Sequence, residues 1–219
     1  ETKIFNLFLK PQKEMREVVD QQKKKEGKLT SIRKIKKLIN YSICKITIDY
    51  KIKMEAKENK IMNPKNIHNT IRRISYQIYE NNFEEKDLVL AGVLENGLIL
   101  AKRIQKELEI ISDLNIILIS LKVDKKNPIN DVIMSNSSFI YEKKSVIVID
   151  DVLNTGSTLI YAVKKFLYFK VKKIQTAVLV NRNHKNFPIK GDFKGISLST
   201  SVKENIDVRF GNDEGVYLS

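Results

Sequence analysis

Apolar residues from position 63 onward follow two spacings, one typical of helices and one typical of buried strands. Asn63 and Pro64 form a common helix start, an N-cap followed by a proline in the first turn. Isoleucines then recur on one helical face at positions 67, 71, 74 and 78. This spacing predicts an amphipathic helix over residues 64–81.

The rest of this region alternates between short β-branched runs and amphipathic stretches. Strands are predicted over residues 87–93, 115–123, 145–149 and 173–180, and helices over 98–111 and 156–168. Such an alternation is typical of an α/β fold in which a parallel sheet is covered by helices on both faces. Residues 124–138 are polar, and we expect a long mobile loop there.

Composition narrows the class of protein. The chain has 219 residues, of which 42% are hydrophobic, and this is enough to build a core. No apolar run approaches the roughly 20 residues that span a bilayer, and the first residues lack the pattern of a secretory signal. We therefore expect a cytoplasmic protein without a membrane partner.

Cys44 is the single cysteine, which excludes an internal disulfide. With only two histidines in the chain, it also argues against a structural zinc site.

Positive charge is concentrated near the start of the chain. The net charge is +14, and residues 1–53 carry 15 Lys and Arg against 6 Asp and Glu. We therefore expect two parts, a basic N-terminal extension over residues 1–59, either a fusion or a partly disordered segment, and a domain over residues 60–219. A basic block attracts polyanions such as RNA, although a solvated lysine-rich segment is the simpler interpretation.

One stretch combines features that a buried strand does not need. Residues 146–159 have the sequence VIVIDDVLNTGSTL, so Asp150 and Asp151 directly follow an apolar run. Adjacent carboxylates repel each other and resist burial. In open parallel sheets, ligands bind at the carboxyl ends of the strands. We therefore expect the two carboxylates to face a ligand.

The residues after the aspartates predict a phosphate-binding turn. The next helix begins here, and its free backbone N–H groups and positive dipole end attract an anion. Gly156 allows the backbone to approach closely, and hydroxyl donors are added by Thr155, Ser157 and Thr158. A ribose 5-phosphate matches this arrangement, with its phosphate on the turn and its vicinal hydroxyls on the carboxylates.

The order D-D-x-x-x-T-G-x-T after a strand resembles the 5-phosphoribosyl 1-diphosphate (PRPP) signature of type I phosphoribosyltransferases. Neither a Walker A loop nor a G-x-G-x-x-G dinucleotide motif is present. A second stretch, AVLVNRNHKNFPIKGDFKGISLSTS over residues 177–201, resembles the C-terminal hood of the pyrimidine operon attenuation regulator and uracil phosphoribosyltransferase family. The resemblance covers nearly all of residues 60–219. It implies a parallel-sheet type I phosphoribosyltransferase fold with a small C-terminal hood.

The resemblance also implies roles for single residues. Asp150 and Asp151 would hold the ribose hydroxyls, directly or through Mg²⁺ and water, and Mg²⁺ is the implied cofactor. The 5-phosphate would lie on residues 154–158, which are Asn154, Thr155, Gly156, Ser157 and Thr158. Asn154 would position the base, because an amide is a poor proton acceptor.

Three further elements are assigned in the same way. The turn that contains Glu95, Asn96 and Gly97 corresponds to the pyrophosphate-binding turn, although the family usually has Thr-Arg-Gly there. Residues 124–138 would form the lid, with Lys125 and its neighbour Lys126 neutralising the departing pyrophosphate. Arg182, in the hood match, would contact a base, a phosphate or RNA, or would close the hood against the sheet.

Two functions of different classes remain open from the sequence. The first is a PRPP-dependent pentosyltransferase, with uracil as the expected base, that makes UMP and pyrophosphate. The alternative is an RNA-binding transcriptional attenuation regulator that senses pyrimidine nucleotides in the same pocket and has weak or no transferase activity. A homodimer is expected from the resemblance.

Overall fold

The computed structural model describes residues 16–17, 20, 59–124, 127, 129–201 and 204–219. Residues 58–219 form one compact unit. Most of the predicted basic extension, residues 1–59, and the candidate Lys125 lie outside the described residues. The division of the chain near residue 59 therefore stays a prediction.

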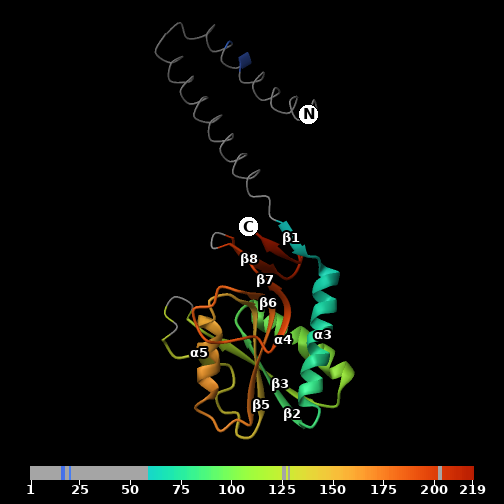
Figure 1. The fold of residues 1–219 in the computed structure, drawn as a ribbon, viewed down its shortest axis with the longest axis vertical. Helices are drawn as coiled ribbons and strands as arrows, with labels where there is room; N and C mark the ends of the chain where they lie inside the picture. Colours follow the sequence, from blue (N-terminus) through green and yellow to red (C-terminus); the bar gives the residue numbers. More distant parts are fainter. Residues whose placement is uncertain (1–15, 18–19, 21–58, 125–126, 128, 202–203) are drawn as a thin grey trace. The chain divides into compact units, whose positions relative to one another are not determined.

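A six-stranded sheet forms the centre of this unit, and five of its strands are parallel (Figure 1). Its strand order is β4-β3-β2-β5-β6-β7, and β4 pairs antiparallel to β3. The strands are β2 (Asp87–Val93), β3 (Asn115–Lys122), β4 (Ile133–Met134), β5 (Ser145–Leu153), β6 (Lys173–Arg182) and β7 (Phe193–Leu198). The parallel strands end at one edge of this main sheet, called here the carboxyl edge, and begin at the amino edge.

Helices cover both faces of the main sheet, as the sequence predicts. On one face, α3 (Pro64–Asn82) and α4 (Asn96–Ile111) pack against alternate strand residues such as Leu88 and Leu90. On the other face, α5 (Ser157–Phe166) packs against the intervening positions, such as Val89 and Ala91. Because successive strand side chains point to opposite faces, a run that is apolar at every position is buried on both sides. The predicted α/β class is confirmed.

Helix starts follow local signals. The Asn63 side chain accepts a hydrogen bond from the N–H of Asn66 at 2.9 Å, which makes it the predicted N-cap of α3. Helix α4 begins at Asn96, two residues before its predicted start, and no side chain caps it. No helix in the described part of the chain is both long and apolar enough to cross a membrane.

A small antiparallel sheet lies beyond the main sheet and was not predicted as such. Its order is β1-β9-β8, from β1 (Asn59–Met62), β8 (Ile206–Arg209) and β9 (Gly215–Leu218). The hood was expected in residues 177–201, but much of that stretch forms β6 and β7 of the main sheet. The reason is that residues 177–180 are fully buried and pair with parallel neighbours on both sides. The C-terminal strands outside the main sheet are β8 and β9, from residues 206–218.

The segment expected to be a loop, residues 124–138, also contains regular structure. Residues 133–134 form β4, where Met134 pairs with Leu121 of β3. Val132 and Met134 are buried in the core on the α5 side, while Ile133 is 63% exposed. The prediction of a continuous loop was wrong here, because two apolar residues at alternate positions are enough to pair this segment with β3.

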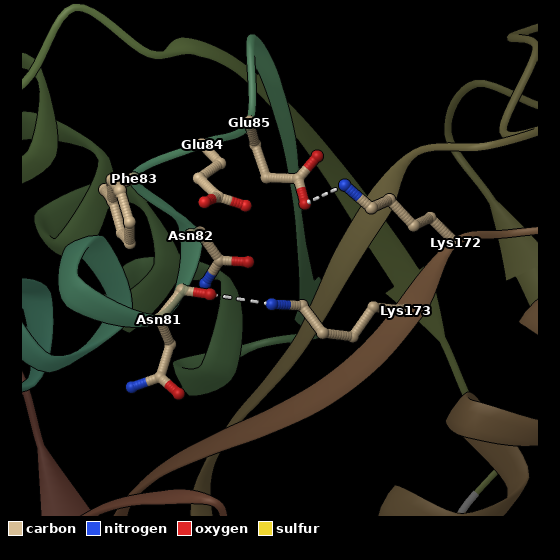
Figure 2. A pocket seen from close by; sticks show the side chains of 7 residues that line it. All are labelled: Asn81, Asn82, Phe83, Glu84, Glu85, Lys172 and Lys173. Atoms are coloured by element: carbon tan, nitrogen blue, oxygen red, sulfur yellow. Dashed lines mark hydrogen bonds and ion pairs between the residues drawn. The ribbon is translucent and has the colours of Figure 1, made fainter.

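The amino edge holds a cavity whose lysines already have partners. Lys172 Nζ lies 2.8 Å from Glu85 Oε1, and Lys173 donates to the Asn81 carbonyl oxygen at 2.7 Å. Figure 2 shows both interactions as dashed lines. Nearby, Lys144 forms an ion pair with Asp87, which also accepts a hydrogen bond from Asn115. The hydrogen bond from Lys172 lowers the pKa of Glu85, and the hydrogen bond from Lys144 lowers the pKa of Asp87. These contacts join strand starts that lie far apart in the sequence.

The ion pairs at the amino edge predict a loss of stability in acid. A carboxylate with a lowered folded-state pKa stabilises the fold above its unfolded value, about 4 here, and this contribution is lost as pH falls through the folded value. Urea unfolding of the wild type and of the double variant Glu85→Gln/Asp87→Asn should show the larger stability loss between about pH 5 and pH 2.5 in the wild type. Glu84→Gln, which removes an exposed carboxylate next to Glu85, is the matched control. Parallel pH profiles for wild type and double variant would contradict the assignment.

Candidate functional site

The two aspartates lie within the C-terminal part of strand β5 rather than after it. Strand β5 was predicted to end at residue 149 but continues to Leu153, because Val152 and Leu153 still pair with β6. Asp150 is 6% exposed and Asp151 is half-buried. Neighbouring strand residues point to opposite faces, and the two carboxylates accordingly line two different cavities at the carboxyl edge.

The first cavity is formed by the turn between β5 and α5. It is lined by Asp150, Val152, Leu153, Asn154, Thr155, Gly156, Thr158 and Leu159. Gly156 has φ of 84°, a left-handed conformation, and a Cβ there would lie 2.6 Å from Ile189 Cγ2. The carbonyl oxygen of Thr155 accepts hydrogen bonds from the N–H groups of Asn186 and Phe187. The turn is therefore held in shape by the segment after β6, with the N-terminus of α5 at its end.

The second cavity is formed by the turn between β2 and α4. It has a volume of about 470 Å³ and is lined by Leu94, Glu95, Asn96, Lys122, Val123 and Asp151. The peptide bond between Leu94 and Glu95 is cis. A Cβ at Gly97 would lie 2.7 Å from the Ile149 carbonyl oxygen, so glycine is required for α4 to start directly beside β5. This close approach brings the predicted turn of residues 95–97 next to the two aspartates.

Asn96 connects the second turn to the carboxylate pair. Its Nδ2 donates to Asp151 Oδ2 at 2.9 Å and to the Val208 carbonyl oxygen of β8 at 2.8 Å. Both amide protons of this side chain are therefore used within the protein. Asn96 consequently fixes the position of the Asp151 carboxylate and joins it to the small sheet.

Arg182 is buried at the end of β6 and orients Asn154. It is 6% exposed, and its Nη1 donates to Asn154 Oδ1 at 3.2 Å. Its other donors reach Thr200 Oγ1 at 2.7 Å and the Ser201 carbonyl oxygen at 2.8 Å. Because the amide oxygen of Asn154 faces the guanidinium, its NH₂ group remains available to donate to a ligand.

The structure brings most of the predicted site residues to one edge. The two aspartates, the turn of residues 154–158 and the turn of residues 95–97 line adjoining cavities, and Arg182 contacts the first turn through Asn154. Lys125 is outside the described residues. Sequence reasoning missed Lys122, although the last residue of a parallel strand is a recognisable position for a ligand contact.

Comparison with known proteins identifies the family. Residues 59–212 match the family described as phosphoribosyl transferase domain. The chain belongs to this family. It is 34% identical over 177 residues to the bifunctional protein PyrR of Fusobacterium nucleatum, and the match covers 75% of this chain and all of that protein. The bifunctional protein PyrR of Haemophilus ducreyi is 30% identical over 169 residues, which cover 73% of this chain and 93% of the relative.

Solved structures of phosphoribosyltransferases share the fold. The hypoxanthine phosphoribosyltransferase of Trypanosoma cruzi superposes with a TM-score of 0.61 at 14% identity, over 74% of this chain and 95% of that one. A hypoxanthine-guanine phosphoribosyltransferase of Bacillus anthracis gives 0.60 at 15% identity, over 73% and 95%. The predicted family, its fold and its enzyme class, a pentosyltransferase, are confirmed.

The contacts of Asn96 predict the effect of replacing it. Asn96→Ala removes two hydrogen bonds, one to a charged oxygen, and should lower the free energy of unfolding by about 1–3 kcal/mol. Urea unfolding measures this loss, and Asn81→Ala is the control because the Asn81 amide bonds only an exposed helix carbonyl. Asn96→Asp should cost more at neutral pH than at pH 4, since it places two carboxylates together. A pH-independent effect of that variant would show that the side chain does not face Asp151.

Proposed function

We propose that this chain transfers the phosphoribosyl group of PRPP to uracil, giving UMP and pyrophosphate. The observation that carries the proposal is the placement of two helix-starting turns on either side of Asp150 and Asp151 at one sheet edge. PRPP fits this order of groups, because its ribose has a phosphate at one end, a pyrophosphate at the other and hydroxyls between them. The choice of uracil rests on the resemblance of residues 177–201 to the uracil-specific family.

In this proposal the two turns bind the two phosphate ends of PRPP. The N-terminal amides of α5 and the hydroxyls of Thr155, Ser157 and Thr158 bind the 5-phosphate. The turn with Glu95, Asn96 and Gly97 binds the pyrophosphate through the first amides of α4. Both turns are closely packed, since a Cβ at Gly97 would meet the Ile149 carbonyl oxygen and a Cβ at Gly156 would meet Ile189 Cγ2. Donors held in place before the substrate binds would favour the reaction.

The two carboxylates would hold the sugar and the metal ion. Magnesium is coordinated by oxygen atoms and commonly uses one or two carboxylates together with substrate phosphates and water. Asp150 and Asp151 supply two such carboxylates at neighbouring positions of β5, and substrate oxygens and water would complete the shell. When bound, Mg²⁺ supplies charge neutralisation to the pyrophosphate. Asp151 is held in place for this by Asn96.

The reaction breaks the bond between C1 of the ribose and the pyrophosphate oxygen, which keeps the electron pair. The base nitrogen forms the new bond from the opposite side and gives up its proton to the departing pyrophosphate or to water, so the configuration at C1 inverts. Asn154, oriented by Arg182, would present its NH₂ group to an acceptor on the base. Lys125 and the rest of residues 124–138 would neutralise the leaving group and keep water away.

Product formation with five bases tests the proposal. The full chain, PRPP and Mg²⁺ are incubated in parallel with uracil, hypoxanthine, guanine, adenine and orotate, and nucleotide is measured by chromatography. Uracil should be converted. Turnover of a different base alone would overturn the assignment of uracil but keep the reaction type. A chain that binds neither PRPP nor UMP would refute the proposal.

Replacing Asp151 tests the sugar contact. Asp151→Asn removes a charged acceptor and should weaken PRPP binding about 10- to 100-fold, the value of a hydrogen bond to a charged group. Binding is followed by calorimetry, with Asp113→Asn as the control because Asp113 is an exposed acid in the connection between α4 and β3. Unchanged affinity for PRPP and UMP in Asp151→Asn would remove this residue from the site.

A second function, binding of RNA as a pyrimidine-sensing regulator, is proposed from two observations. The relatives are named bifunctional, and the chain carries a net charge of +14. An RNA-binding protein of this charge should lose affinity steeply as salt rises, because each phosphate contact releases counterions. Filter binding of full-length protein to RNA at several salt concentrations, with and without UMP, measures this. A UMP-independent affinity would indicate charge attraction alone. We also propose that the chain forms a homodimer, as the family resemblance implies.

A further inference from the structure

The second cavity poses a charge problem for a pyrophosphate ligand. Two of its lining residues, Glu95 and Asp151, are acids, whereas pyrophosphate itself carries several negative charges. The turn supplies no cation, and the Asn96 amide, at the position where the family usually has arginine, already donates to Asp151 and Val208. Departure of pyrophosphate requires positive charge near its oxygens. Bound Mg²⁺ would supply part of this charge, and any positive charge from the protein itself has to come from an element other than this turn.

Lys122 lies where such a cation is needed. It is the last residue of β3 and the one cationic side chain among the described residues that line this cavity. The N–H of Leu94 donates to the Leu121 carbonyl oxygen at 2.9 Å, so β3 and the turn after β2 are joined directly beside it. Lys122 also pairs with Ile133 of β4. Strand pairing thus fixes its backbone on both sides.

The side chain of Lys122 is exposed and forms no ion pair with any residue that the structure describes. The lysines of the amino-edge cavity in Figure 2 differ, because Lys172 pairs with Glu85 and Lys173 donates to a carbonyl oxygen. A lysine without such a partner keeps its ammonium group for a ligand anion. For Lys122, this anion would be the ligand that binds in the second cavity, which Glu95 also lines.

We propose that Lys122 is the cationic contact for pyrophosphate, and that it takes over in this chain the charge that the turn of residues 95–97 lacks. This deepens the proposed function and rests on it. As the bond between C1 and oxygen breaks, the oxygen keeps the electron pair, and the ammonium group of Lys122 attracts the charge that develops on the leaving group. No proton or further reactant is needed for this step. Because Lys122 belongs to the sheet, its contribution does not depend on closure of residues 124–138.

Neutral and charged replacements of Lys122 test the proposal. Lys122→Met keeps most of the side-chain length without the charge, and Lys122→Arg keeps the charge. Calorimetry with Mg²⁺ should show affinity for pyrophosphate and for PRPP about 10- to 100-fold weaker in Lys122→Met and largely restored in Lys122→Arg. Affinity for UMP, which has no pyrophosphate, should stay within about twofold of the wild type because its phosphate lies on the other turn. Lys102→Met, at an exposed position of α4, is the matched control.

The outcomes separate this inference from the proposed function. Unchanged pyrophosphate affinity in Lys122→Met would overturn the role of Lys122, and so would an equal loss of UMP affinity, which indicates a structural effect. Thermal unfolding of each variant would reveal such a structural effect independently. A wild-type protein that binds UMP but not pyrophosphate would contradict the inference while the nucleotide site remains. Binding of neither PRPP nor UMP would refute the proposed function itself.

Discussion

The contact between Gly97 and the end of β5 is the constraint on which the rest of the site depends. A Cβ at this position would lie 2.7 Å from the Ile149 carbonyl oxygen and 3.0 Å from Asp150 Cα. With hydrogen in its place, the first turn of α4 lies directly beside the aspartates. The second cavity is lined on one side by Asn96, at the start of this turn, and on another by Asp151. Asn96 and Asp151 are brought within hydrogen-bonding distance by this close approach.

The small sheet is connected to the candidate site through the Asn96 side chain. Asn96 bonds Asp151 with the same amide nitrogen that bonds the Val208 carbonyl oxygen of β8. A shift of β8 would therefore be transmitted to a carboxylate of the central sheet without any large change in the fold. Side-chain networks of this kind rigidify a site when every donor has a partner. The small sheet is thereby coupled to the Asp151 carboxylate of the candidate site.

The sequence predicted the main sheet well because its strands and helices have distinct periodicities. Buried β-branched runs and the isoleucines of α3 leave little choice of structure. The small sheet escaped prediction because β1, β8 and β9 have four residues each, and β1 pairs with a strand more than 150 residues later. The aspartates and the turn of residues 154–158 were found from a local motif, and the turn of residues 95–97 from the family resemblance. The contact of Asn96 with Asp151 and the place of Lys122 beside Glu95 depend on strand order, which no local pattern contains.

Pairing of β1 with β9 has a consequence for how the protein is made. Asn59 lies opposite Leu218, so the first and last strands of the compact unit are neighbours in one sheet. Strand β8 joins that sheet only through β9. On the ribosome, the main sheet can assemble while the last strands are still in the exit tunnel, but the small sheet cannot close until they emerge. Val208 of β8 accepts a hydrogen bond from Asn96, so this contact of the candidate site forms only after the last strands have been translated.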